Sequence, residues 1–136
     1  MEWNGKNVRQ KPGPWNALGK VKFLFPNSHS IYLHDTPSKN AFGNDFRAFS
    51  HGCIRVNEPK RLAMYILRKQ PEWTEQKIET AMNSSKEQYV KINDPVPVII
   101  IYFTSWVDRT GRLNFRNDVY KRDSRLAEMI IEDSGL

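Results

Sequence analysis

The most apolar stretch of the chain, residues 97–107, places the strongest constraint on the fold. It contains the run VIIIYF at residues 98–103, which is rich in β-branched and aromatic side chains. A helix needs roughly 20 apolar residues to cross a membrane, and this stretch is shorter. A short apolar run of β-formers is typical of a strand buried on both faces. We therefore expect no membrane span, and a core that covers this strand within one domain.

Two shorter segments predict strands by their alternation. Residues 20–25 place Val21, Phe23 and Phe25 on one face and Lys20 and Lys22 on the other, which is the period of a half-buried strand. Residues 31–35 repeat the pattern and place Tyr32 and His34 on the same face. Residues 36–49 have no sustained period and are expected to form a surface loop that returns the chain to the sheet.

Three short helices are expected, because each has a start signal followed by apolar residues at helical spacing. The first begins at Asn57 or Glu58 and ends at Pro71, the second begins at Thr74, and the third begins at Ser124 or Asp123. Residues 89–93 are interpreted as a further short strand, and residues 108–111 as a hairpin turn.

The predicted fold class is mainly β with short helices, that is, α+β. We expect residues 1–19 to be an N-terminal loop and residues 20–136 to form the folded part.

Composition narrows the functional classes. Apolar residues make up 39% and charged residues 26% of the chain, which is typical of a folded, soluble domain and not of a disordered one. Lys and Arg exceed Asp and Glu by 21 to 15, so the net charge is +6. Such a charge suits an acidic partner, or is simply a solvated basic surface. The first residues lack the apolar run of a signal peptide, so we expect either a cytoplasmic chain or one whose targeting segment is not included.

The chemistry centres on one cysteine and a histidine. Cys53 is the only cysteine, so no disulfide forms within the chain. A thiol is a poor nucleophile until a neighbouring imidazole removes its proton. His34 ends a predicted strand, a rigid element that suits this task. Asp35 follows it and points the other way in a strand, so a backbone carbonyl is the better candidate for orienting the ring.

The residues around Cys53 fit acyl transfer. Gly52 lets the backbone bend, so the amides of Gly52 and Cys53 become candidate donors to an oxyanion. Arg55 shares a face with Cys53 if this segment is extended, and its guanidinium suits a substrate carboxylate.

Two other interpretations remain open from the residues alone. A lone cysteine is commonly a small buried side chain. His34, His51 and Cys53 also form a candidate zinc set. The spacing of His51 and Cys53 is tight for one ion, and no further cysteine completes the usual pattern, so we favour no metal.

The segment SHGCIRV at residues 50–56 resembles the signature of the L,D-transpeptidase catalytic (YkuD-type) domain. In that family a histidine precedes the SHGC stretch, and the spacer between them is similar in length to residues 35–49, which separate His34 from Ser50 here. The flanks resemble the large periplasmic YcbB-like branch. They read PGPWNALGKVKFLFPNSHSIYLHDTPSKNAF, RVNEPKRLAMYIL and PVPVIIIYFTSWVDRTGRLNFRNDVY.

The resemblance implies a YkuD-type β-sandwich, incomplete at its N-terminal side, with residues 20–136 as the C-terminal part of the catalytic domain. It implies roles for seven residues: Cys53 as nucleophile, His34 as base, His51 and Gly52 shaping the site, Ser50 supporting the loop, and Arg55 and Tyr32 binding substrate.

The implied reaction forms 3→3 cross-links between peptidoglycan stem peptides through a thioester. It needs no metal or organic cofactor, and we expect carbapenem-type β-lactams to inhibit it. Water as the acceptor would make the enzyme an L,D-carboxypeptidase. The implied location is the periplasm or cell envelope, without a nucleic-acid partner.

Two expectations follow from the missing upstream strands. Open sheet edges predict a homodimer through edge pairing, or limited stability. A chain without its donor groove would instead serve as a non-catalytic module that binds the cell wall or a polyanion, with Trp3, Trp15 and Trp106 as contact points.

Overall fold

The computed structural model of this chain describes residues 1–3, 5, 8–50 and 52–134. The chain divides into two compact units, Met1–Val98 and Ile99–Leu136, and each is described by itself.

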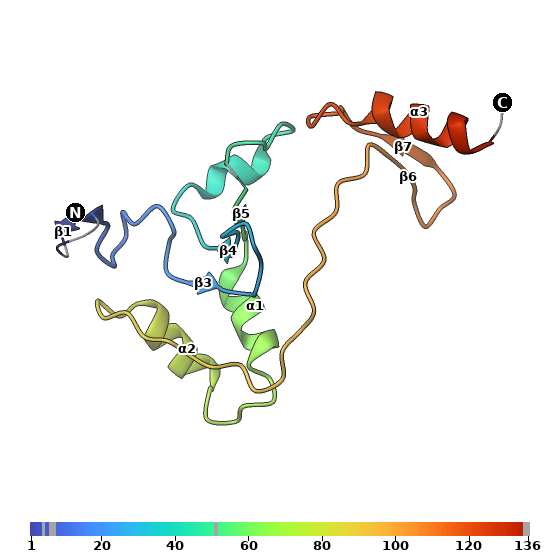
Figure 1. The fold of residues 1–136 in the computed structure, drawn as a ribbon. Helices are drawn as coiled ribbons and strands as arrows, with labels where there is room; N and C mark the ends of the chain where they lie inside the picture. The colour runs from blue at the N-terminus through green and yellow to red at the C-terminus, as the bar shows by residue number, and fades with distance from the viewer. Residues whose placement is uncertain (4, 6–7, 51, 135–136) are drawn as a thin grey trace. The chain divides into compact units, whose positions relative to one another are not determined.

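The first unit contains a three-stranded sheet of short strands, in the order β3-β4-β5 (Figure 1). Strand β3 is Lys22–Phe23, β4 is Leu33–His34 and β5 is Ile54–Arg55. Strands β3 and β4 are antiparallel, whereas β4 and β5 are parallel. A parallel pair needs a long connection, and here it is the segment that includes the 3₁₀ helix η1, Lys39–Gly43.

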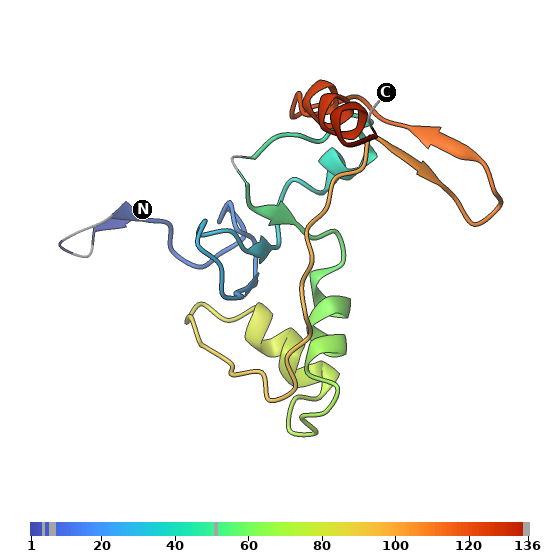
Figure 2. The same cartoon turned by 45° about the vertical axis from the view of Figure 1, so that its right-hand side comes forward.

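Two helices supply the remainder of this unit's core. Helix α1 is Pro59–Ile66 and helix α2 is Glu75–Met82, and they pack against each other (Figure 2). Pro59 occupies the first turn of α1, where its missing N–H costs no hydrogen bond. The buried apolar side chains come from β3 and the helical region: Phe23, Ala63, Leu67 and Ile78.

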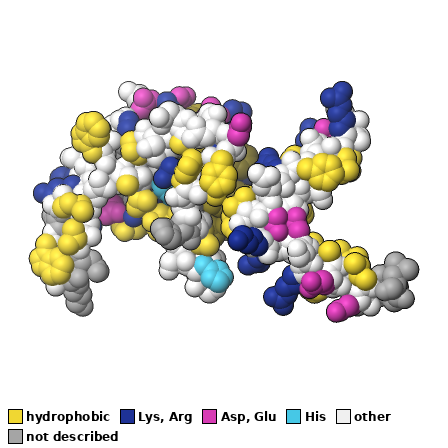
Figure 3. Space-filling model, turned by 90° about the horizontal axis from the view of Figure 1, so that it is seen from above, with side chains coloured by type: hydrophobic (Ala, Val, Ile, Leu, Met, Phe, Trp, Pro, Cys, Tyr) yellow, Lys and Arg dark blue, Asp and Glu magenta, His cyan; other side chains and the backbone are white. Residues whose placement is uncertain are grey.

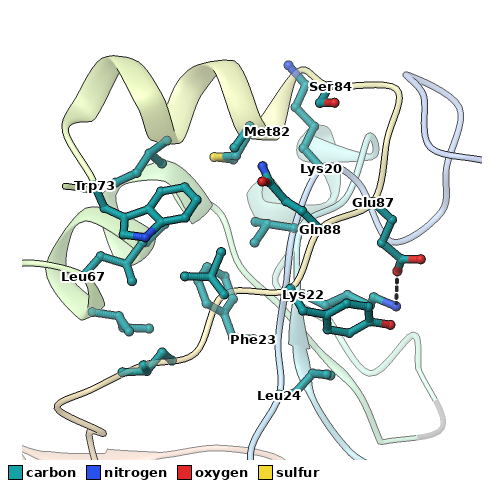
Figure 4. A pocket seen from close by; sticks show the side chains of 18 of the residues that line it. Lys20, Lys22, Phe23, Leu24, Leu67, Trp73, Met82, Ser84, Glu87 and Gln88 are labelled. Atoms are coloured by element: carbon teal, nitrogen blue, oxygen red, sulfur yellow. Dashed lines mark ion pairs between the residues drawn. The ribbon is translucent and has the colours of Figure 1, made fainter. Parts of the chain in front are cut away.

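Next to this core lies a cavity of about 250 Å³ (Figure 4). Phe23, Leu67 and Trp73 line its apolar side, and Lys22 forms an ion pair with Glu87 across 3.6 Å at its rim. The first unit therefore has a small core that borders an open pocket.

The second unit is a hairpin followed by a helix. Strands β6, Ser105–Val107, and β7, Leu113–Phe115, pair antiparallel, and helix α3 is Asp123–Ser134. Tyr102 donates a hydrogen bond to the carbonyl of Asn117 at 2.7 Å.

The α+β fold class is confirmed, and all three helices begin within two residues of the predicted positions. The hairpin turn is confirmed as well: the amide of Gly111 donates to the carbonyl of Asp108 at 3.0 Å. No helix among the described residues is long and apolar enough to cross a membrane.

Three local predictions are wrong. Residues 1–19 are not all loop, because β1, Glu2–Trp3, and β2, Val8–Arg9, pair as a small hairpin. Residues 89–93 form no strand.

The third error concerns residues 97–103, which are neither strand nor buried, with Ile99 83% exposed. An apolar run becomes a strand only when another strand accepts its backbone hydrogen bonds, and no described strand pairs with this one. Hydrophobic side chains are visible on the face shown in Figure 3.

Candidate active site

The candidate site lies on one face of the two parallel strands. Leu33 is opposite Ile54 and His34 is opposite Arg55 in the register of β4 and β5. The amide of Ile54 also donates to the carbonyl of Tyr32 at 3.1 Å, which brings the start of β5 beside Tyr32. Since successive side chains of a strand alternate between faces, His34 and Arg55 share the face opposite to Leu33 and Ile54. The alternation of side chains predicted for residues 31–35 is therefore present in β4, which pairs in parallel with β5.

Tyr32 brings the cysteine and the histidine into one cluster. Its ring meets the His34 ring edge-on, with 5.9 Å between centroids. Burial raises the pKa of Tyr32, and the neighbouring Cys53 raises this pKa further through its charge and a hydrogen bond with the Tyr32 side chain. Cys53 is half-buried and carries a free thiol. The phenol therefore neighbours both the thiol and the imidazole.

His34 is 5% exposed. Its Nδ1 lies 2.5 Å from the backbone carbonyl of Asp35. A carbonyl can only accept, so Nδ1 carries a proton in this hydrogen bond, and in the neutral form of such a ring Nε2 is the acceptor. The prediction that a carbonyl, and not the Asp35 carboxylate, orients the ring is confirmed.

The loop before β5 is closed by Ser50. Its hydroxyl donates to the carbonyl of Cys53 at 2.5 Å and accepts from the amide of Gly52 at 3.2 Å. Gly52 has φ +146°, and a Cβ there would lie 3.3 Å from Ile31. A side chain at this position would be strained by both its backbone conformation and its surroundings. The backbone of this turn thus fixes the position of Cys53, which directly precedes β5.

The two remaining residues of the predicted site are Arg55 and His51. Arg55 is half-buried, and within the described part of the chain no acidic side chain forms an ion pair with it. Its guanidinium is therefore not neutralised by those residues. His51 lies outside the described residues, so its predicted place beside Cys53 is a prediction still.

Sequence reasoning missed Lys39. Its ammonium lies 2.7 Å from Oδ1 of Asp35 and donates to the backbone carbonyls of Val56 and Asn57. The signal available in the sequence was a lysine four residues after Asp35, which would have indicated this local ion pair.

The family model of the L,D-transpeptidase catalytic domain (YkuD) matches residues 1–100. The chain belongs to this family. A protein of Haemophilus influenzae, which its name assigns provisionally to the L,D-transpeptidases, is 40% identical over 119 residues. The match covers 88% of this chain and 24% of that protein, so the chain spans about a quarter of the length of this relative.

The cluster lies within the part of the chain that matches the YkuD family. The match to the family model includes β4, β5 and the loop between them, and these segments bring together Tyr32, His34, Ser50, Cys53 and Arg55. The groups present here are a thiol, an imidazole and a guanidinium, and acyl transfer can use all three.

Proposed function

We propose that this chain carries the acyl-transfer site of an L,D-transpeptidase, with Cys53 as the nucleophile and His34 as the base. The observation that carries the proposal is the hydrogen bond from His34 Nδ1 to the Asp35 carbonyl. It leaves Nε2 as the proton acceptor, on the strand paired with the one that Cys53 precedes.

In the proposed first step, the Cys53 thiol gives its proton to Nε2 of His34, and the sulfur attacks the carbonyl carbon of the third residue of a stem peptide. The carbon–nitrogen bond to the terminal D-Ala then breaks, and the leaving amine takes the proton from His34. The product is a thioester on Cys53. A side-chain amine of a second stem attacks this thioester, which releases the thiol and gives a 3→3 cross-link.

The oxyanion of the tetrahedral intermediate needs a donor. The Gly52 amide already donates to Ser50. Among the described residues, the Cys53 amide has no such partner, so we assign the oxyanion to this amide. A single good donor of this kind contributes about 3 kcal/mol to the transition state.

Substrate binding is assigned to Arg55 and Tyr32. The guanidinium of Arg55 suits the carboxylates of a peptidoglycan stem, because it donates two parallel hydrogen bonds to such a group. Tyr32 neighbours both reacting side chains. The same scheme with water as acceptor gives an L,D-carboxypeptidase. The corresponding location is the cell envelope, and the resemblance of the flanking sequence supports the YcbB-like branch.

The test is the mass of the intact protein after exposure to a carbapenem, because a thiolate opens the β-lactam ring and keeps the whole molecule. We expect one adduct on the wild-type chain and none on the Cys53→Ala variant. A folded wild-type chain that gains no adduct contradicts the proposal.

The matched variant for the base is His34→Gln, which keeps an amide near the Asp35 carbonyl and removes the imidazole. We expect the adduct to form roughly 10²- to 10⁴-fold more slowly. An unchanged rate removes His34 from the mechanism. If instead the chain gains no adduct but binds cell-wall polymer with a steep salt dependence, it is a binding module.

A further inference from the structure

Lys39 ties together the chain segments that leave the two catalytic strands. Its Nζ lies 2.7 Å from Oδ1 of Asp35, directly after β4. The same ammonium donates to the carbonyls of Val56 and Asn57, at 3.0 and 2.7 Å, directly after β5. One cation therefore contacts both sides of the parallel pair, immediately beyond His34 and Arg55.

Asp35 is held from a second side as well. It is 5% exposed, and its Oδ2 accepts the backbone amide of Lys20 at 2.9 Å. Gly19 allows this approach, because a Cβ there would lie 2.4 Å from the Asp35 carboxyl group. Burial alone would raise the pKa of Asp35, but the Lys39 ammonium and the backbone amides of Lys20 and Thr36 lower it. The carboxylate is thus charged and fixed in place.

The backbone carbonyl of Asp35 also accepts a hydrogen bond from Nδ1 of His34. The direction of the Asp35 carbonyl depends on the dihedral angles of Asp35, and these are restrained when its side chain is anchored at both oxygens. An ion pair on the side chain can therefore control the imidazole through the main chain.

We propose that the Lys39–Asp35 ion pair is a positioning pair, which aims the Asp35 carbonyl at Nδ1 of His34 and so keeps Nε2 unprotonated and directed at the thiol. The consequence for acyl transfer rests on the proposed function. The consequence for the tautomer of His34 does not, and it is measurable by itself.

The tautomer is read from the ¹⁵N shifts of the His34 ring by NMR, above about pH 8, where an ordinary imidazole is neutral. In the wild-type chain we expect the proton on Nδ1. In Lys39→Met we expect a mixture of both tautomers and a carbapenem adduct that forms about 10- to 100-fold more slowly, since small displacements of a catalytic group have effects of this size. In Lys39→Arg, which keeps the charge, the wild-type tautomer should return.

Lys60→Met is the matched control. Lys60 also forms ion pairs, with Glu75 and Glu79, and its side chain is 37% exposed against 42% for Lys39. This variant should lose a comparable surface network and leave both the His34 tautomer and the adduct rate unchanged. A change in the His34 tautomer that is as large in Lys60→Met as in Lys39→Met would overturn the proposal. Loss of any surface ion pair would then have the same effect.

Asp35→Asn decides the matter if Lys39→Met does not fold. It keeps the shape of the side chain beside Gly19 and removes the charge that Lys39 binds, so we expect the same mixed tautomers. A wild-type tautomer in whichever of these variants folds overturns the proposal. If the tautomer shifts as expected while the wild-type chain gains no carbapenem adduct, the proposed function fails and the positioning role stands.

Discussion

At the scale of single residues, Asp108 shows how one carboxylate organises a turn. Its Oδ1 accepts the hydroxyl of Thr110 at 2.6 Å and the amides of Thr110 and Arg112. Its Oδ2 accepts the side-chain amide of Asn114 at 3.2 Å. These donors favour the charged form, and they lower the pKa of Asp108 to about 2 from an ordinary value of 3.8. The carboxylate is in this way part of the β6–β7 hairpin.

The pH dependence of this hairpin follows from the lowered pKa. A group whose pKa is lower in the folded state stabilises that state above its unfolded value, and the stabilisation is lost as the pH falls. We expect the contribution of Asp108 to be complete above pH 3.8 and to disappear towards pH 2. The carboxyl ¹³C shift of Asp108 measures this directly by NMR.

Thr110→Val removes the first of these donors and should raise the pKa of Asp108. The control is Thr104→Val, whose hydroxyl donates to Asp123 instead. A pKa of Asp108 that is the same in both variants contradicts the assigned cause.

At the scale of elements, the two helices of the first unit begin in different ways. Thr74 precedes α2 and its hydroxyl accepts the amide of Lys77 at 3.3 Å, which satisfies one of the free N–H groups of the first turn. Glu58 precedes α1, and its side chain makes no such bond. The start signal of that helix is instead the proline in its first turn, which has no N–H group to satisfy. Both start signals are local, so both were readable in the sequence.

Replacing the cap of α2 should therefore destabilise the first unit. We expect Thr74→Ala to lower the free energy of unfolding by about 1 kcal/mol, as measured by urea denaturation. Thr80→Ala is the matched control, because the Thr80 hydroxyl only bonds the Gln76 carbonyl within the same helix and alanine is the better helix former. An equal loss in both variants would mean that the cap has no specific effect.

At the scale of the whole molecule, the notable feature is apolar surface that remains uncovered. Residues 99–103 are exposed, with Ile99 at 83% and Ile101 at 63%. An exposed run of β-branched residues with unpaired backbone groups is a template for pairing with another chain. The homodimer expected from sequence therefore has a specific candidate segment in this structure, while the pairing itself stays a prediction.

We expect the chain to self-associate in a concentration-dependent way, as measured by light scattering after size-exclusion chromatography. The double variant Ile99→Lys and Ile101→Lys should shift the population to monomer, because charges on an edge oppose pairing. Ile130→Lys on α3, at a residue that is also 60% exposed, is the control. A wild-type chain that stays monomeric at every concentration contradicts the prediction.

Local order in this protein was determined by the sequence, because it depends on neighbours along the chain. The strands around Phe23 and Leu33, the helix starts near Glu58 and Thr74 and the turn at Asp108 all follow from side chains a few residues apart. The motif around Cys53 was readable for the same reason.

Only the tertiary structure decided which segments become partners. It pairs β4 with β5 in parallel, and it places Lys39 on Asp35 and on the carbonyls after β5. It also leaves residues 97–103 without a strand, although their composition predicts one. Burial and backbone pairing need a partner brought from elsewhere in the chain, and residue composition does not specify whether that partner is there.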